Sequence, residues 1–121
     1  MIAMLAGGTG AARFLRGLLA LIPQQELTLI VNTGDDTEVW GLHISPDLDT
    51  LMYQLAGLLD EERGWGVRAD TFACLAMMER YGEPTWFRLG DRDVATHLVR
   101  TRLLREGRSL TDATAVLGRR L

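Results

Sequence analysis

The stretch Ala6-Gly7-Gly8-Thr9-Gly10-Ala11-Ala12 follows directly on the apolar run Met1–Leu5 and decides how the rest of the chain is interpreted. Its three glycines lack the Cβ atoms that would keep a ligand away from the backbone. The residues that follow, 11–21, are typical of a helix, so the loop presents free backbone N–H groups at a helix N-terminus. Helix ends of this kind bind phosphate or diphosphate. We therefore predict a phosphate site at Gly7, Gly8, Thr9 and Gly10; the alternative is a tight turn that binds nothing.

A second apolar run, Leu27–Val31, is rich in β-branched residues and stops at Asn32. With the run at 1–6 and the helix between them, it predicts a strand–helix–strand unit, which implies a parallel sheet. Because the run at 1–6 is continuously apolar, we expect its strand to be buried on both faces. The predicted fold class is α/β, a Rossmann-like three-layer fold with a mainly parallel sheet, truncated after residue 121.

Turn and cap signals divide the remaining chain into helices, which we expect to begin at Ser45-Pro46, Asp70, Gly90 and Ser109. The last of these has the spacing of a capping box. The segment 85–89 is predicted as a strand, and 39–44 is either a short strand or an ordered loop. In the helix after Gly90 we expect apolar residues inside and basic residues in solvent: Val94, Leu98 and Val99, against Arg100, Arg102 and Arg105.

The composition of the chain argues against some classes of partner. The chain has 121 residues, is 47% hydrophobic and carries a net charge of -3, which indicates one small globular domain and argues against nucleic acid or a membrane as a partner. The single cysteine, Cys74, lies in an apolar stretch and is expected to be buried. One unpaired cysteine and the lack of a signal peptide predict a cytoplasmic protein.

The glycine loop matches neither of two familiar phosphate-binding patterns. A Walker loop needs a lysine, and the chain contains none. The dinucleotide pattern needs a third glycine where this chain has Arg13. The loop therefore predicts phosphate binding but not NAD.

Acidic residues gather at predicted strand ends and helix starts, namely Asp35, Asp36, Asp47, Asp49, Asp91 and Asp93. In a parallel α/β sheet, ligands bind outside the carboxyl ends of the strands. Carboxylates that meet there hold Mg²⁺ against substrate phosphates or accept a proton from an attacking hydroxyl. The alternative is that each is a helix cap or turn former.

Other polar residues give weaker signals. Arg88 ends the run at 85–89, and is either an outward side chain or a clamp on a ligand. His43 and His97 have no Cys/His partners, which argues against zinc. The tryptophans are expected to be packing residues. No serine motif or activated cysteine supports covalent catalysis.

Taken together, several ordered motifs resemble the CofD/FbiA family. They are Gly7-Gly8-Thr9-Gly10 with Arg13-Phe14-Leu15, Asn32-Thr33-Gly34-Asp35-Asp36, Ser45-Pro46-Asp47-Leu48-Asp49-Thr50, Arg63-Gly64-Trp65-Gly66 and Leu89-Gly90-Asp91-Arg92-Asp93. The resemblance implies a phospholactate or phosphoenolpyruvate transferase of coenzyme F-420 biosynthesis. Such enzymes move a phospho-acid group from a guanosine diphosphate conjugate to the ribityl hydroxyl of the deazaflavin precursor Fo, releasing GMP with Mg²⁺ present.

The resemblance also implies roles for individual residues. Gly7 to Gly10 would cradle the diphosphate, and Asp49 and Arg88 would bind the deazaflavin. Asp49 is the expected catalytic residue, and Asp47 and Asp49 are the expected metal ligands. Four further residues would line the nucleotide side of the cleft: Asn32, Asp35, Asp36 and Asp91.

Family chains are more than twice as long, so residues 1–121 are expected to form the N-terminal part of a single transferase domain. Parts that bind guanine and form a homodimer are expected beyond them. The alternative function is a non-catalytic, nucleotide-sugar-binding regulator of the related gluconeogenesis-factor family, which shares the Gly-Gly-Thr-Gly start. The Pro-Asp-Leu-Asp, Gly-Trp-Gly and Gly-Asp-Arg-Asp stretches argue against that alternative.

Overall fold

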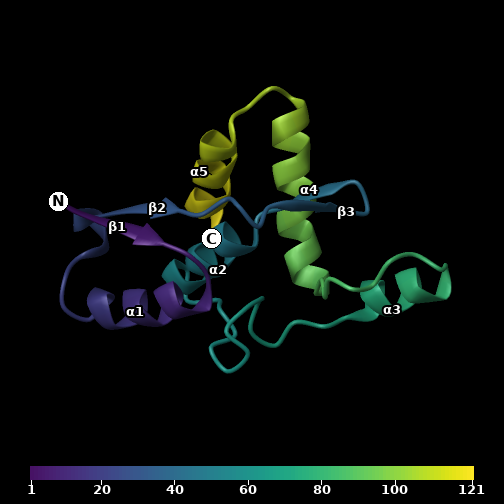
Figure 1. Ribbon diagram of the computed structural model, residues 1–121, viewed down its shortest axis with the longest axis horizontal. Helices are drawn as coiled ribbons and strands as arrows, with labels where there is room; N and C mark the ends of the chain where they lie inside the picture. The colour runs from purple at the N-terminus through teal and green to yellow at the C-terminus, as the bar shows by residue number, and fades with distance from the viewer.

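A computed structural model describes all 121 residues (Figure 1). Strands β1 (Ile2–Ala6) and β2 (Leu27–Val31) pair in parallel, with Ile2 opposite Leu27 and Ala6 opposite Val31. Helix α1 (Thr9–Leu19) and the short 3-10 helix η1 (Gln24–Glu26) connect them. This is the predicted strand–helix–strand unit, so the α/β, Rossmann-like fold class is confirmed.

The two faces of this parallel pair have different surroundings. Met4, Ala6, Leu29 and Val31 belong to the main hydrophobic core, which they share with α1 and with helix α2 (Pro46–Leu55). The opposite face is open to solvent, because Leu5 is 81% and Ile30 57% exposed. The prediction that β1 is buried on both faces is therefore wrong for this chain, since none of its elements covers the second face.

Strands β3 (Thr37–Val39) and β4 (Leu42–Ile44) form a small antiparallel hairpin. The two residues between them, Trp40 and Gly41, have φ angles of 54° and 74°, as a tight two-residue hairpin turn requires. The segment 39–44, which the sequence predicted as either a short strand or an ordered loop, thus contains the turn and the second strand of a hairpin. It leads directly into α2, which begins with Pro46 in its first turn.

Three helices complete the chain: α3 (Ala73–Arg80), α4 (Asp91–Arg105) and α5 (Leu110–Arg120). Figure 1 shows α4 and α5 side by side, and α3 at the side of the molecule away from β1 and β2. The predicted cap of the last helix is confirmed, because the Ser109 side chain accepts a hydrogen bond from the Asp112 N–H. The predicted strand at 85–89 is wrong: this segment pairs with no strand and connects α3 to α4 irregularly.

Helix α3 begins three residues later than predicted, because Asp70 caps a different helix. Its carboxylate accepts hydrogen bonds from the backbone N–H groups of Arg92 and Asp93 at the start of α4. In return, the Asp91 carboxylate accepts from the N–H groups of Ala73 and Cys74 at the start of α3. The two helix starts therefore cap each other. Cys74 is exposed rather than buried as expected.

Candidate functional site

Some of the predicted site residues converge on one cavity of about 400 Å³. Its walls come from the glycine loop, the start of α2, the Gly-Trp-Gly loop, the segment before α4 and the first half of α4. The predicted site residues that line it are Gly8, Thr9, Asp47, Asp49 and Arg88. Residues as far apart in the sequence as Gly8 and Arg88 thus meet around a single space.

The glycine loop forms the first wall. Helix α1 begins after Gly8 with no side chain capping its N-terminus, so its first N–H groups face outward without a side-chain partner. A Cβ placed on Gly8 would lie 3.0 Å from the Asp47 carboxylate, so only glycine lets these two segments approach so closely. Gly7 and Gly10 have open space where a Cβ would stand, and neither lines the cavity.

The Gly-Trp-Gly loop packs directly against the glycine loop. The Thr9 hydroxyl donates to the Gly64 carbonyl oxygen at 3.1 Å. Gly64 has a φ angle of 82°, and a Cβ there would lie 2.5 Å from the Thr9 methyl group. Position 64 therefore requires glycine for two reasons, its positive φ angle and its close contact with Thr9. Trp65 is thereby held at the cavity wall.

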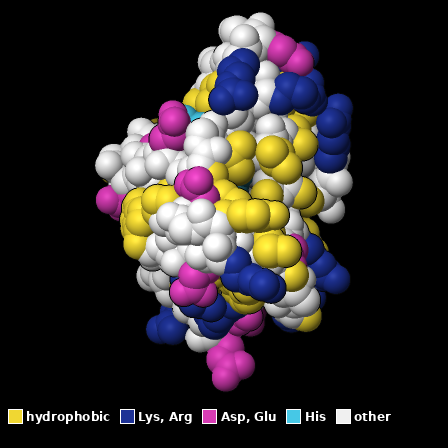
Figure 2. Space-filling view, turned by 90° about the vertical axis from the view of Figure 1, so that its right-hand side faces the viewer, with side chains coloured by type: hydrophobic (Ala, Val, Ile, Leu, Met, Phe, Trp, Pro, Cys, Tyr) yellow, Lys and Arg dark blue, Asp and Glu magenta, His cyan; other side chains and the backbone are white.

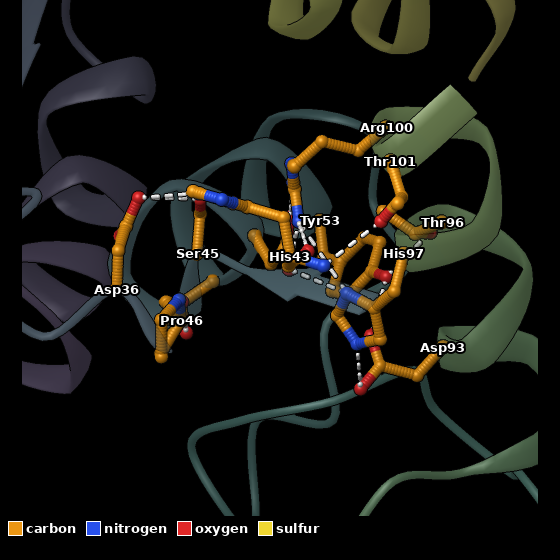
Figure 3. A network of polar contacts seen from close by, with 12 residues as sticks. Asp36, His43, Ser45, Pro46, Tyr53, Asp93, Thr96, His97, Arg100 and Thr101 are labelled. Carbon is orange, nitrogen blue, oxygen red and sulfur yellow. Dashed lines mark hydrogen bonds and ion pairs between the residues drawn. The ribbon is translucent and has the colours of Figure 1, made fainter. Parts of the chain in front are cut away.

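The second wall contains a buried network of polar side chains, shown in Figure 3. Arg100 of α4 has no exposed surface and donates to both oxygens of the Asp49 carboxylate, from Nη2 to Oδ1 and from Nη1 to Oδ2, the latter at 3.2 Å. This position contradicts the expectation that Arg100 faces solvent and Leu98 the core, because Leu98 is the exposed residue of the two. The carboxylate on α2 decides which face of α4 is buried.

His97 lies between two carboxylates of this network. Its Nδ1 is 3.5 Å from Asp49 Oδ2, and its Nε2 is 3.2 Å from Asp93 Oδ2, without the alignment of a hydrogen bond. The Tyr53 hydroxyl donates to Asp93 Oδ1 at 2.6 Å and lies 2.7 Å from the Thr96 hydroxyl. The network therefore ties α2 to one face of α4 by polar contacts.

Burial and charge act against each other in this network. Burial raises the pKa of Asp49 above its ordinary value, while the charge and hydrogen bonds of Arg100 oppose that rise. Burial alone would also raise the pKa of Asp93, but the contact and charge of His97 and the bond from Tyr53 lower it. Burial raises the pKa of the Tyr53 phenol, which therefore stays protonated and donates.

Aromatic side chains form the third wall. Trp65 is 36% and Trp86 68% exposed, and both line the cavity together with Phe87. The expectation that the tryptophans only pack is therefore wrong for these two. Behind them, the Arg63 guanidinium stacks on the Trp65 ring at 4.4 Å, and the Arg88 guanidinium lies 5.2 Å from the Phe72 ring. The cavity thus has an aromatic side with arginines beside it. Hydrophobic side chains also gather across the middle of the face shown in Figure 2, with acidic and basic side chains around them.

The remaining predicted residues lie outside the cavity lining. The Asn32 side-chain amide donates to Asp47 Oδ2 at 2.9 Å, so Asn32 lies directly behind the lining. Asp36 accepts from the Ser45 hydroxyl at 2.8 Å and contacts His43 at 3.0 Å. Asp35 is exposed, and Asp91 caps α3 as described above. That these residues contact a nucleotide stays a prediction.

Tyr53, His97 and Arg100 belong to this wall although the sequence did not indicate them as site residues, whereas Asp93 was among the acidic residues expected near the site. Asp93, His97 and Arg100 stand at i, i+4 and i+7 of one helix, the spacing that places side chains on one face. Asp49 and Tyr53 have the same four-residue spacing on α2. Polar residues at helical spacing thus indicate both faces, whereas apolar spacing alone places Arg100 in solvent.

A group of three ligand-type side chains lies in this wall. Asp49, Asp93 and His97 offer atoms within 4.8 Å of one another. Mg²⁺ prefers oxygen ligands in a site that keeps several waters, whereas this group is buried, contains an imidazole and has Arg100 bound to Asp49. The group therefore fits Mg²⁺ poorly, and Asp49 as a metal ligand stays a prediction. Asp47, beside the glycine loop, offers oxygen atoms at a less buried position.

No helix of the chain is both long and apolar enough to cross a bilayer.

Comparison with known proteins shows which family the chain belongs to. Residues 2–121 match the family model described as 2-phospho-L-lactate transferase CofD. The chain is 56% identical over 118 residues to a phosphoenolpyruvate transferase of Kitasatospora aureofaciens, and 51% identical over 117 residues to one of Streptomyces griseus. Each match covers 96% of this chain but 37% of the relative, so the chain spans little more than a third of the length of these relatives. The chain belongs to the CofD family.

Proposed function

We propose that the protein carrying this chain is a phosphoenolpyruvate or phospholactate transferase of coenzyme F-420 biosynthesis. It moves the phospho-acid group of a guanosine diphosphate conjugate to the ribityl hydroxyl of Fo and releases GMP. The observation that carries the proposal is the shared cavity: Gly8 and Thr9 line one side, and Asp49 and Arg88 line the same space. The names of the relatives support the reaction class.

The donor binds at the glycine loop in this proposal. The uncapped start of α1 offers backbone N–H groups and the positive end of a helix dipole, which favour a diphosphate. The Asp47 carboxylate stands beside Gly8 and would repel a bare diphosphate at this distance. A cation between them removes that repulsion, so Asp47 is the residue we expect to hold Mg²⁺. Bound Mg²⁺ would neutralise charge on the phosphates.

The acceptor binds at the aromatic wall. The deazaflavin ring is flat and aromatic, and Trp65 and Trp86 present the exposed apolar surface that such a ring needs. Arg88 lies at the edge of this wall, where its guanidinium meets polar groups of the ring. The ribityl chain then extends toward Asp49.

Asp49 assists the attack in this proposal. It accepts the proton of the ribityl hydroxyl as the hydroxyl oxygen bonds to the phosphorus that carries the acid, and the bond to the GMP oxygen breaks. No nucleophile of the protein is required. Positioning and charge neutralisation carry most of the catalysis in phosphoryl transfer of this type.

The test is incubation of the full-length protein with Fo, Mg²⁺ and each guanosine conjugate in turn, with GMP followed by chromatography. We expect GMP with one donor and none without Fo. The Asp49→Asn variant is expected to lose at least about a hundredfold in kcat, within the usual range for a general base. No GMP with either donor, together with tight binding of a UDP-sugar, would instead support the regulator alternative.

A further inference from the structure

We infer that Arg100 is a positioning residue for Asp49, and that it fixes the carboxylate in the orientation needed to meet the acceptor hydroxyl. The inference rests on the proposed function and adds to it a residue that never touches the substrate. Asp49 lines the cavity, whereas Arg100 lies behind it with no exposed surface.

The geometry of the pair supports an orienting role. Arg100 donates from both of its terminal nitrogens to both oxygens of Asp49, the two-pronged arrangement that fixes the plane of a carboxylate. The same Nη1 lies 3.5 Å from the His43 carbonyl oxygen and 3.4 Å from His97 Nδ1. Arg100 is thus held by α4, by the β4 strand and by its ion pair, while Asp49 itself is part of the cavity lining.

His97 supports the arrangement from the other side. Its ring lies between the two carboxylates, with Nδ1 3.5 Å from Asp49 Oδ2 and Nε2 3.2 Å from Asp93 Oδ2. Two buried carboxylates this close would repel each other without the cationic and polar groups between them. Asp93 is fixed in turn by the Tyr53 hydroxyl.

Stability alone does not explain a buried arginine. Removing two charges from water is costly, and well-packed apolar residues often stabilise a core as well as a buried ion pair does. The Arg100 Nε atom has no hydrogen-bond partner, an additional cost. Of this pair, Asp49 lines the cavity together with the predicted site residues Gly8, Asp47 and Arg88, so a role in that site accounts for the cost.

Three variants of the full-length protein test the inference. Arg100→Gln removes both the positive charge and the paired hydrogen bonds to the two Asp49 oxygens. Arg100→Lys keeps the charge but cannot make that paired contact. Arg102→Gln is a matched control on the exposed side of α4, where Arg102 pairs only with Glu106. Each is assayed for GMP release with Fo and the active donor, after thermal unfolding has shown that it is folded.

Because a misplaced catalytic group costs on the order of a hundredfold in rate, we expect kcat to fall about a hundredfold in Arg100→Gln and about tenfold in Arg100→Lys. The donor KM should stay within about twofold, because Arg100 makes no contact with the glycine loop. Arg102→Gln should retain the parent kcat. If Arg100→Gln does not fold, Arg100→Lys is the test: its kcat should fall while its donor KM stays within about twofold.

Two results overturn the inference. A folded Arg100 variant with the parent kcat shows that Asp49 needs no positioning by this side chain. An equal loss in kcat and in donor binding shows general damage to the fold instead. Failure of the proposed function is distinct from both: the parent protein itself then releases no GMP with either donor, and the inference falls with it.

Discussion

At the scale of single residues, the candidate site combines side chains with opposite requirements. Arg100 and His97 are fully buried polar groups, while Trp86 is a large apolar group that is 68% exposed. Charged side chains are almost never fully buried unless they are paired, and an exposed tryptophan that lines a cavity is available to a ligand. Each makes sense once a ligand occupies the cavity, since the ligand covers the tryptophan and meets the carboxylate that the arginine holds.

The exposed tryptophan gives the first prediction. In Trp86→Ala, the affinity for Fo should fall about tenfold, because loss of one aromatic stacking contact costs roughly 1–3 kcal/mol. The KM for the guanosine conjugate should not change. Tyr81→Ala is the control, since Tyr81 is 74% exposed but lies outside the cavity lining. Fo fluorescence on titration measures both variants, and equal affinity of the Trp86 variant and the parent would argue against an aromatic acceptor wall.

Asp91 gives a pH-dependent prediction. The hydrogen bonds from the Thr71 hydroxyl and from the backbone N–H groups of Cys74 and Ala73 lower the pKa of Asp91 below its ordinary value of 3.8. The charged carboxylate therefore stabilises the fold above the pKa of the unfolded chain, and this stabilisation is lost as the pH falls through the lower folded pKa.

Asp91→Asn should accordingly unfold at a lower temperature than the parent at pH 7, and the difference should shrink as the pH approaches 3. Thermal unfolding followed by circular dichroism between pH 7 and pH 3 measures it. Asp35→Asn is the control, because Asp35 is exposed and makes no polar contact. A difference between Asp91→Asn and the parent that stays constant with pH would mean that the charge of Asp91 contributes nothing to the cap.

At the scale of elements, the connection between α3 and α4 depends on a glycine. Gly90 is buried, and a Cβ there would overlap the Asp70 carboxylate that caps α4. Its φ angle of -75° is ordinary, so the requirement for glycine is steric rather than conformational.

We expect Gly90→Ala to lower the free energy of unfolding by about 1–2 kcal/mol, the usual cost of a lost cap. Gly17→Ala is the matched control: Gly17 lies inside α1 with open space at the Cβ position, so alanine there should be neutral or stabilise by up to about 1 kcal/mol. Urea unfolding measures both. Equal effects of the two substitutions would show that Asp70 moves aside without cost.

A helix or strand can be predicted from the sequence when contacts between residues close in the sequence determine it, and less well when distant residues do. The unit of β1, α1 and β2 was predicted correctly, because the spacing of its apolar residues and the positions of its glycines and proline determine the local backbone structure. The segment 85–89 has the composition of a strand but no strand beside it to pair with, and composition alone does not reveal that.

The candidate site divides in the same way. Gly8, Thr9, Asp47, Asp49 and Arg88 lie within local motifs, and all line the cavity. Arg100 does not belong to any such motif. Its burial depends on a carboxylate 51 positions away, and a helix with arginines at 100, 102 and 105 offers no local sign of which one is buried.

At the scale of the whole molecule, the parallel sheet is covered on one face only. Leu5 and Ile30 point to the open face, where a Leu or Ile side chain buries little apolar surface and so adds little to the free energy of unfolding. The core face instead packs Met4 and Leu29 against residues such as Leu15, which is fully buried. The two faces should therefore respond differently to substitution in the 121-residue chain.

Replacing both Leu5 and Ile30 by Thr should change the free energy of unfolding of this chain by less than about 0.5 kcal/mol per site, as at other exposed positions. Leu15→Ala should lower it by about 2–5 kcal/mol, because a cavity remains in the core. The open face is also an apolar surface that favours association, so the double Thr variant should scatter less light than the parent at the same concentration. A large loss of stability in the double variant would show that this face is covered in solution, by a second copy of the chain if the loss depends on protein concentration.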